Sequence, residues 1–416
     1  MNPRHQSGSL EIWTYQVASR LSTYDDCDVI IYAKEDDRYP KFEEYNGVQY
    51  RRVSLGLDEK TNRLANTTER ILSYPRPKLP VFAQRFYYHN YIKQVAVDLR
   101  DQAYDIAHIF NFSQFAPVIK AHNPNMKVVL NMTSEWLSQL DNNAIQQRLS
   151  SVDRIVSCSN HVTYKVQERF PEHAAHCATV YNGVESDGLI DSQKEPLRKT
   201  VRKRRLLFVG RVSPEKGVHV LMQAMPKILE ACPDVELDLV GPTSSLPYEY
   251  LVMISNDEKV SGLSVYYPKG LKRLDNYFES LQASLSPDMA KQVNFIGQVP
   301  HANIMSYYQH ADVLINPSLS ESFGISLIEA MANGRPVVAS RVGGMQEIVI
   351  EGETGLFFEP GDADALAESA ITLLENPEIR KSMGMAGRRR VQEIFSWDHV
   401  TQDLLQQYTR TLESED

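Results

Sequence analysis

The sequence is short of cysteine and of long apolar runs, and each shortage excludes a class of protein. Its 416 residues hold only four cysteines, with no close metal-type spacing among them: Cys27, Cys158, Cys177 and Cys232. We therefore expect reduced thiols, as in cytosolic proteins, rather than a disulfide framework. No apolar run approaches the roughly 20 residues of a membrane-spanning helix, and the amino terminus does not resemble a signal peptide. The prediction is a cytoplasmic protein.

The sequence also lacks a basic excess and a nicotinamide-binding motif. Its 44 Lys and Arg residues are outnumbered by 53 Asp and Glu residues, which gives a net charge of −9. This balance argues against a protein that binds nucleic acid. No G-x-G-x-x-G follows a predicted strand, so a nicotinamide oxidoreductase is not favoured. The length predicts two or three domains with an ample core.

What the chain does have is an alternation of strand-length apolar runs with helical patterns, such as the one over 218–231. This alternation predicts an α/β fold with parallel sheets and right-handed crossovers. Ligands bind such sheets outside the carboxyl ends of the strands. The predicted strands are 28–33, 48–53, 105–110, 127–132, 153–158 and 177–182 in the amino half, and 204–209, 235–240, 292–296, 313–317 and 336–340 in the carboxyl half.

The most informative stretch is 321–329, which reads Glu-Ser-Phe-Gly-Ile-Ser-Leu-Ile-Glu. It leads from a predicted strand into a buried helix that begins near Ile325. The first N–H groups of a helix lack partners, so this end favours anions. Glu321 before the helix and Glu329 one turn inside it are expected to stay ionised and to accept hydrogen bonds from hydroxyls. A nucleotide sugar fits this pattern; the alternative is a capped core helix with no ligand.

A second loop, 210–217, lies between the predicted strand 204–209 and the helix over 218–231. Arg211 and Lys216 flank this glycine-bearing loop. Arginine offers a planar fork and lysine a mobile point charge, a combination that suits two adjacent phosphates. The alternative is a solvated basic turn on the surface.

The two loops together, G-R-x-x-x-x-K-G and E-x-x-x-x-x-x-x-E with F-G inside it, resemble the retaining family 4 glycosyltransferases of GT-B fold. The resemblance implies two Rossmann-like, doubly wound parallel-sheet domains facing each other across a cleft. The expected division is an acceptor-side domain over 1–190 completed by a helix over 397–416, a linker over 191–204, and a donor-binding domain over 205–396. Further matching segments are 180–184, 294–297, 311–313, 334–340, 343–349 and 353–356.

The resemblance implies that the donor is a nucleotide-diphosphate sugar, with a UDP-sugar preferred, and that neither a metal nor another cofactor takes part. The leaving diphosphate would itself accept the acceptor's proton, while Arg211, Lys216 and the amides near 324–327 stabilise its charge. Glu321 would hold sugar hydroxyls and Glu329 ribose hydroxyls. The catalytic residues expected are Arg211, Lys216, Glu321 and, with less support, His108. The expected donor-binding residues are Gly8, Arg211, Lys216, Gly241, Val299, Glu321, Phe323, Gly324, Ile325, Ser326, Leu327 and Glu329.

Other activities and partners stay open at this point. A sugar-nucleotide epimerase of GT-B type would act on the donor alone, and a non-catalytic protein would bind the nucleotide without turnover. A phosphorylase is not favoured, because no segment resembles a pyridoxal phosphate lysine site. The sequence names neither the hydroxyl acceptor nor the oligomeric state. The basic segment 194–205 reads as a solvated connector; contact with the inner face of an anionic membrane is the alternative.

The amino half departs from the family pattern in several places. The chain opens at the loop that family members place after a first apolar strand. We therefore expect either that this strand is absent, which would leave its neighbours unpaired, or that the given sequence starts downstream of the real one. Asn131 and Thr133 stand where histidines are common, and Glu135 is a candidate polar group on the acceptor side. His108 is retained, although a lone histidine after apolar residues is often only packed in a core. The segment 243–289 is expected to be an insertion beside the nucleotide site.

Overall fold

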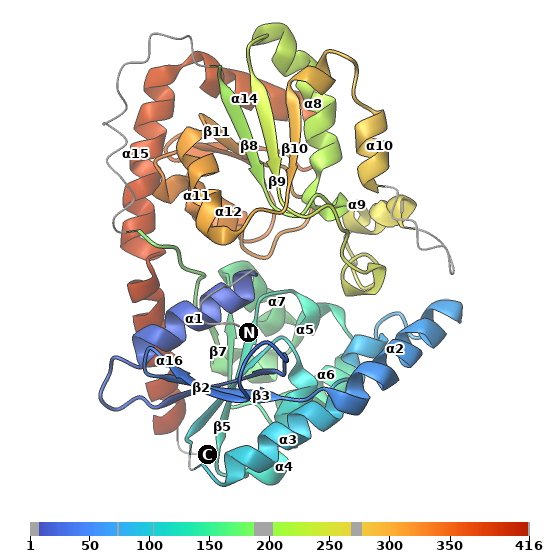
Figure 1. Ribbon diagram of the computed structural model, residues 1–416, viewed down its shortest axis with the longest axis vertical. Helices are drawn as coiled ribbons and strands as arrows, with labels where there is room; N and C mark the ends of the chain where they lie inside the picture. The colour runs from blue at the N-terminus through green and yellow to red at the C-terminus, as the bar shows by residue number, and fades with distance from the viewer. Residues whose placement is uncertain (1–7, 73–74, 103, 187–202, 268–276, 415–416) are drawn as a thin grey trace. The chain divides into compact units, whose positions relative to one another are not determined.

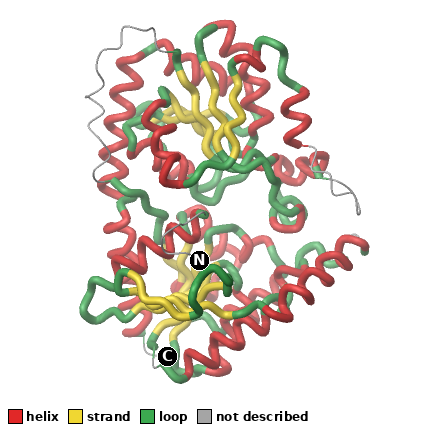
Figure 2. The backbone as a smooth tube through the Cα atoms, in the orientation of Figure 1, coloured by secondary structure: helices red, strands yellow, loops and turns green. Residues whose placement is uncertain are grey.

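The computed structural model describes residues 8–72, 75–102, 104–186, 203–267 and 277–414 (Figure 1). The chain divides into two compact units, Met1–Tyr181 with Asp398–Asp416, and Asn182–Trp397. Each unit contains parallel strands flanked by helices (Figure 2). Most of the expected linker, 191–204, lies outside the described residues, so the predicted domain boundaries stay a prediction. No helix in the described part of the chain is long and apolar enough to cross a membrane.

The carboxyl-terminal unit is built on one six-stranded sheet in which all neighbours are parallel. Its order is β10-β9-β8-β11-β12-β13, so the first strand in chain order lies in the middle. The loops after β8 and β11 therefore leave the sheet side by side at its carboxyl edge. The bounds are β8 (Arg205–Val209), β9 (Glu236–Val240), β10 (Val293–Gly297), β11 (Val313–Asn316), β12 (Val337–Ser340) and β13 (Gly355–Phe358).

Five of these six strands are predicted from the sequence, and each is confirmed to within one residue at either end. The sixth, β13, is missed because it has four residues and begins with a glycine, which weakens a strand pattern. The structure explains that glycine. A Cβ atom at Gly355 would lie 2.4 Å from the carbonyl oxygen of Val337 on β12, so the two strands approach too closely for a side chain.

The core of this unit lies between the sheet and two helices, α8 (Val218–Ala231) and α14 (Ala363–Glu375). The range of α8 confirms the helix predicted over 218–231. Its residues Leu221, Met225 and Ile228 are fully buried with Leu206 and Phe208 of β8. The remaining helices are α9 (Glu258–Ser261), α10 (Tyr277–Ala283), α11 (His301–His310), α12 (Ile325–Ala332), α13 (Met345–Ile348) and α15 (Pro377–Ile394), with short 3-10 turns η5 (Pro214–Lys216), η6 (Tyr248–Tyr250), η7 (Gly262–Tyr266) and η8 (Met289–Lys291).

The amino-terminal unit has two separate sheets, ordered β1-β3-β2 and β4-β5-β6-β7. Its strands are β1 (Val29–Lys34), β2 (Phe42–Tyr45), β3 (Val48–Val53), β4 (Ile106–Phe110), β5 (Lys127–Met132), β6 (Arg154–Ser157) and β7 (Cys177–Thr179). All six strands predicted for this half are confirmed, although β7 ends three residues early. All pairs are parallel except β2 with β3. Among the described residues no strand joins β1 to β4.

The expectation of purely parallel sheets is wrong at β2. This strand turns back onto β3 through Asn46 and Gly47, which both have positive φ values, 49° and 72°. Two left-handed residues in succession make the tight hairpin turn that Asn-Gly favours. The sequence pattern of β2 is weak because Glu43 and Glu44 interrupt the apolar residues, as is common for an edge strand.

The helices of the amino-terminal unit cover its sheets, and the last helix of the chain belongs to it. They are α1 (Ser9–Leu21), α2 (Gly56–Ile71), α3 (His89–Arg100), α4 (Ala116–His122), α5 (Trp136–Gln139), α6 (Asn142–Leu149), α7 (Asn160–Arg169) and α16 (Trp397–Glu413), with 3-10 turns η1 (Val81–Ala83), η2 (Ser113–Phe115) and η3 (Pro171–His176). The final helix thus returns to the amino-terminal unit, as the family resemblance implies.

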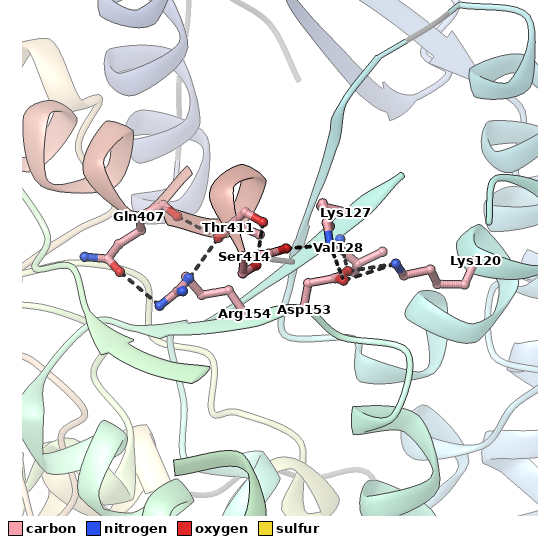
Figure 3. Close-up of polar contacts among 8 residues, drawn as sticks. All are labelled: Lys120, Lys127, Val128, Asp153, Arg154, Gln407, Thr411 and Ser414. Carbon is pink, nitrogen blue, oxygen red and sulfur yellow. Dashed lines mark hydrogen bonds and ion pairs between the residues drawn. The ribbon is translucent and has the colours of Figure 1, made fainter. Parts of the chain in front are cut away.

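Figure 3 shows how α16 is fixed to the β4-β5-β6-β7 sheet. The Arg154 guanidinium donates to Thr411 Oγ1 over 2.8 Å and to Gln407 Oε1 over 3.4 Å. The Lys127 ammonium donates to the backbone carbonyl of Ser414 over 3.3 Å. Thr411 is fully buried. The first residues of β5 and β6 therefore bind a helix from the far end of the sequence.

Candidate active site

The centre of the candidate site is an ion pair between the two loops singled out in the sequence. The Lys216 ammonium lies 2.6 Å from Glu321 Oε2, although 105 residues separate them. Their side chains are only 25% and 16% exposed. Since β8 and β11 are neighbours, their loops meet at the carboxyl edge of the sheet, where ligands bind in open α/β sheets.

Backbone contacts fix these two loops against each other. The Leu319 N–H donates to the Glu215 carbonyl over 2.8 Å. A Cβ atom at Gly217 would lie 1.9 Å from the carbonyl oxygen of Pro317, and the φ of Gly217 is +65°. Only glycine allows both this conformation and this approach. The position of Lys216 relative to Glu321 is therefore set by the backbone as well as by charge.

The electrostatics of the pair favour a charged lysine. Burial opposes the charge of Lys216, but the Glu321 carboxylate outweighs burial, and the pKa of Lys216 is raised above its ordinary value. Arg211 lies close enough to Lys216 to act against that rise. In the described part of the chain the Arg211 guanidinium makes no hydrogen bond or ion pair. The buried Glu215 carboxylate of the same loop also acts on Lys216, so Arg211 and Lys216 lie close to two carboxylates.

The helix α12 contributes its amino end, as predicted, and begins at Ile325. Its N-cap residue Gly324 has φ 113°, and no side chain caps the first turn. Ser326 is held by Asn316, whose Nδ2 donates to Ser326 Oγ over 3.3 Å. Uncapped N–H groups beside Arg211 and Lys216 add to the attraction for an anion. Phe323 and Leu327 are buried around this turn.

Glu329 lies deeper than Glu321 and differs from it chemically. It is 9% exposed, and its Oε2 accepts a hydrogen bond from the Tyr308 hydroxyl over 2.5 Å. Burial raises the pKa of Glu329 to about 7, against a smaller opposing effect of the Tyr308 hydrogen bond. Burial thus opposes the expected ionisation of this carboxylate and favours its protonated form. Glu329 is the fifth residue of α12, so burial dominates over the dipole of the first turn.

Gly241 and Val299 follow β9 and β10 at the same edge of the sheet. The Gly241 N–H donates to the Gly297 carbonyl over 2.9 Å. A Cβ atom at Gly241, whose φ is +144°, would lie 1.9 Å from the carbonyl oxygen of Gly210, so the loops after β8 and β9 touch through backbone alone. Val299 is half-buried in the next loop. The structure thus brings all the predicted residues of the carboxyl-terminal unit to one edge.

The two remaining predicted residues, Gly8 and His108, belong to the amino-terminal unit. Gly8 is the N-cap of α1 in an extended conformation. His108 Nδ1 lies 2.6 Å from the Tyr408 hydroxyl of α16, and its ring packs against Trp13 and Phe110. Burial lowers the pKa of His108 to about 3, so the imidazole is neutral at physiological pH. These contacts are those of a packed histidine.

Glu135, a candidate on the acceptor side, lies at the start of α5 after β5. Its carboxylate accepts from His161 Nε2 over 2.8 Å and from the Lys165 ammonium over 2.6 Å, both on α7. Burial raises its pKa, but these two partners together prevail and lower it. Nearby, the Thr133 N–H donates to Asn111 Oδ1 over 2.8 Å. Thr133, one of the two positions where family members place histidines, is thus hydrogen-bonded to Asn111.

Sequence reasoning missed Tyr308, which is fully buried on α11 behind Glu329. No motif identifies Tyr308, because the sequence pattern of a tyrosine in a helix predicts only a core residue. The expected insertion 243–289 packs beside the Lys216 loop through η7. Its Tyr277 hydroxyl lies 2.9 Å from His219 Nδ1, and Tyr266 stacks 5.2 Å from the same ring. Residues 268–276 of this segment lie outside the described residues. No group of three or more His, Cys, Asp or Glu side chains able to hold a metal occurs among those described.

Comparison with known proteins agrees with this geometry. The family model of glycosyl transferases group 1 matches residues 190–390, and that of glycosyltransferase family 4 matches residues 10–187. Spore coat protein SA of Bacillus subtilis is 28% identical over 77% of this chain and 82% of its own length. D-inositol 3-phosphate glycosyltransferase of Corynebacterium urealyticum is 31% identical over 63% of this chain, which spans only 58% of that relative.

Among solved structures, the Anabaena protein HepE in complex with UDP and glucose superimposes with a TM-score of 0.67. It covers 97% of both chains at 16% identity, a level that shows the fold alone. That fold is GT-B. The two family models together span nearly the whole sequence and meet at residues 187–190, a few residues after the division between the two units at Tyr181. The chain is therefore a glycosyltransferase and belongs to glycosyltransferase family 4.

Proposed function

We propose that this glycosyltransferase takes its sugar from a UDP-sugar and transfers it to a hydroxyl acceptor with retention at the anomeric carbon. The observation that carries the proposal is the 2.6 Å pair of Lys216 and Glu321 beside Arg211, whose guanidinium has no hydrogen-bond or ion-pair partner among the described residues. The Lys216 ammonium suits a diphosphate, and the Glu321 carboxylate beside it can accept hydrogen bonds from the hydroxyls of a sugar. The two side chains together therefore suit the place where a diphosphate joins a sugar. The complex of HepE with UDP and glucose supports the choice of donor.

Each residue has a distinct task in this proposal. Arg211 and Lys216 bind the diphosphate and stabilise the charge that grows on it as the bond to the sugar breaks. The first N–H groups of α12 assist them. Glu321 accepts hydrogen bonds from sugar hydroxyls, and Glu329, in its ionised form, accepts them from the ribose.

The reaction balances without a protein nucleophile. The bond between the anomeric carbon and the diphosphate oxygen breaks, and a bond to the acceptor oxygen forms on the same face of the sugar. The acceptor's proton passes to the departing diphosphate, which becomes free UDP. The protein's contribution is to position both substrates and to offset charge.

A binding and product experiment tests the proposal. UDP should raise the unfolding midpoint more than ADP or GDP at equal concentration, because a ligand that binds only the folded state stabilises it by RT ln(1 + [L]/Kd). Candidate UDP-sugars are then incubated with hydroxyl acceptors, and NMR of the product gives its anomeric configuration. An inverted product contradicts retention, and preference for another nucleotide contradicts the choice of UDP.

The same experiment separates the alternatives. An epimerase would convert the UDP-sugar to a second UDP-sugar in the absence of any acceptor. A non-catalytic binding protein would show the thermal shift with UDP and no turnover with any donor and acceptor pair. Either result would replace the transfer reaction proposed here while leaving the nucleotide site in place.

A further inference from the structure

Part of the insertion 243–289 forms a small hydrophobic core beside the donor loops. This insertion core consists of three buried aliphatic residues with three tyrosines packed around them: Val252, Leu263 and Leu319, with Tyr248, Tyr266 and Tyr267. Leu319 does not belong to the insertion, because it lies in the loop after β11, two residues before Glu321. Its side chain is buried, with the residue 7% exposed. The insertion therefore packs directly against the loop that carries Glu321.

Leu319 lies between a fixed part of this loop and Glu321. Before it, Ser318 is fully buried, and both its N–H and its hydroxyl donate to Asn316 Oδ1, over 3.2 and 2.7 Å. After it, the Gly344 N–H donates to the Glu321 carbonyl over 3.3 Å, which is a long hydrogen bond. The packing of the Leu319 side chain against the insertion core therefore helps to set where the Glu321 carboxylate lies.

A second part of the insertion is bonded to the segment that follows Lys216. Helix α8 begins after Gly217, which has no side chain to cap the first turn. The Tyr277 hydroxyl caps it instead, because it accepts from the His219 N–H over 3.1 Å and lies 2.9 Å from His219 Nδ1. Burial lowers the pKa of His219 to about 4, so the neutral ring can accept the proton of the hydroxyl at Nδ1. Tyr277 thus fixes α8 three residues after Lys216.

Tyr266 connects these two contacts within the insertion. It packs both against the insertion core and against the main core of the carboxyl-terminal unit. Its ring lies edge-on at 5.0 Å from that of Tyr277 and at 5.2 Å from that of His219. Tyr277 is 1% exposed and belongs to the main core together with Leu281 of the same helix. The second half of the insertion is therefore anchored in the main core, and the insertion core packs against it through Tyr266.

We propose that the insertion positions the two donor-binding side chains separately: Leu319 sets the place of Glu321, and Tyr277 sets the place of Lys216. Both are positioning residues, since each acts through another side chain. The inference rests on the proposed function, in which Glu321 binds the sugar and Lys216 the diphosphate. Leu319 then governs the affinity that the sugar adds, and Tyr277 governs the affinity for the diphosphate, which UDP and a UDP-sugar share.

The Leu319 contact is tested by calorimetry with UDP, UDP-glucose, UDP-galactose and UDP-N-acetylglucosamine. The factor by which the best UDP-sugar binds more tightly than UDP is called the sugar gain. Leu319→Ala should remove most of the sugar gain and leave UDP affinity within about twofold, and Leu319→Met should retain the gain. In a Glu321→Gln background, Leu319→Ala should change the sugar gain by no more than about twofold. Leu263→Ala removes the insertion side of the same contact and should reproduce the loss.

The Tyr277 contact is tested with the same ligands. Tyr277→Phe should weaken UDP and the UDP-sugar by the same factor, about 5- to 10-fold, and leave the sugar gain unchanged. In a Lys216→Ala background the same change should have an effect of no more than about twofold. Leu373→Ala in the core of α14 and Tyr50→Phe in the amino-terminal unit are the controls for lost volume and for a lost buried hydroxyl. Both should leave the two affinities within about twofold, whatever their effect on the unfolding midpoint.

The outcomes separate this inference from the proposed function. Equal losses of UDP and UDP-sugar affinity in Leu319→Ala would overturn the inference. So would effects of Leu319→Ala or Tyr277→Phe that persist in full in the Glu321→Gln and Lys216→Ala backgrounds. The proposed function survives these results if Glu321→Gln alone removes the sugar gain and Lys216→Ala alone weakens UDP. If the wild-type protein binds no UDP, or if both of those single variants bind as wild type does, the proposed function fails and the inference fails with it.

Discussion

The Tyr308 hydroxyl donates a hydrogen bond to the Glu329 carboxylate over 2.5 Å, with the tyrosine fully buried and the glutamate 9% exposed. Burial and the adjacent carboxylate raise the pKa of Tyr308 well above its ordinary value, so its hydroxyl remains a donor. The pair thus presents one carboxylate with one oxygen already occupied. In the proposed function the remaining oxygen accepts from the ribose, and the protonation of Glu329 controls nucleotide binding.

The first prediction concerns pH and stability. The pKa of Glu329 is raised from 4.5 to about 7 in the folded protein, so the folded state holds a proton that the unfolded state releases between these values. The contribution of Glu329 is therefore fully present below pH 4.5 and is lost as pH rises through 7, at no more than about 1.4 kcal/mol per pH unit. In urea unfolding, Glu329→Gln should gain stability relative to wild type between pH 5 and pH 8. A constant difference across this range would contradict the raised pKa.

The second prediction concerns pH and nucleotide binding. UDP binding measured by calorimetry should strengthen as pH rises from 6 to 8, because hydroxyls donate to the ionised form of Glu329. Glu329→Gln should bind UDP about 10- to 100-fold more weakly at pH 8, the loss expected for a hydrogen bond to a charged group. Its remaining pH dependence should be that of UDP alone. Tyr308→Phe is the companion variant and should shift the wild-type profile to higher pH, because it removes the hydrogen bond that lowers the pKa of Glu329.

The third prediction separates the two glutamates. Glu321→Gln should bind free UDP as well as wild type or better, because it releases the ammonium of Lys216 from its 2.6 Å ion pair. It should nevertheless lose the extra affinity that the sugar of a UDP-sugar provides. Glu353→Gln, an exposed glutamate beyond β12, is the matched control and should change neither affinity. Equal losses for UDP and UDP-sugar in Glu321→Gln would refute the division of tasks.

The fourth prediction concerns the two cations. Lys216→Ala should weaken UDP binding and lower turnover at least about 10-fold. The positive charge of Lys216 attracts the diphosphate in the ground state and in the transition state. Arg211→Lys should also be harmful because lysine lacks the planar fork. Lys227→Ala is the control for charge, since Lys227 forms exposed ion pairs with Asp364 and Glu368 on a helix surface. Wild-type rates in both site variants would show that the phosphates bind elsewhere.

The fifth prediction concerns the contact that sets the two loops together. Gly217→Ala should lower the free energy of unfolding by more than about 2 kcal/mol, because its φ is +65° and its Cβ would lie 1.9 Å from the Pro317 carbonyl. UDP affinity should fall with it, since Lys216 would move. Gly262→Ala is the control: no atom lies within 4 Å of its Cβ and its φ is not positive. A change within about 0.5 kcal/mol is expected there, and the same small change at Gly217 would contradict the argument.

The sequence by itself determined the α/β class, the range of α8, eleven strands and the pairing of two loops into one site. It could do so because buried parallel strands are continuous apolar runs, and because Arg211, Lys216, Glu321 and Glu329 stand in motifs whose spacing reflects a ligand.

Tertiary structure alone decided the rest. No motif predicts the raised pKa of Glu329 or its hydrogen bond from Tyr308. Both depend on burial, and burial depends on residues that pack from other elements. His108 became a packed residue through Trp13 and Tyr408, which lie 95 positions before it and 300 after it. The short strands β2 and β13 are held by pairing with β3 and β12, which the sequence pattern of each short strand does not show. The apolar cavity lined by β1 and β4 likewise depends on two strands that belong to separate sheets.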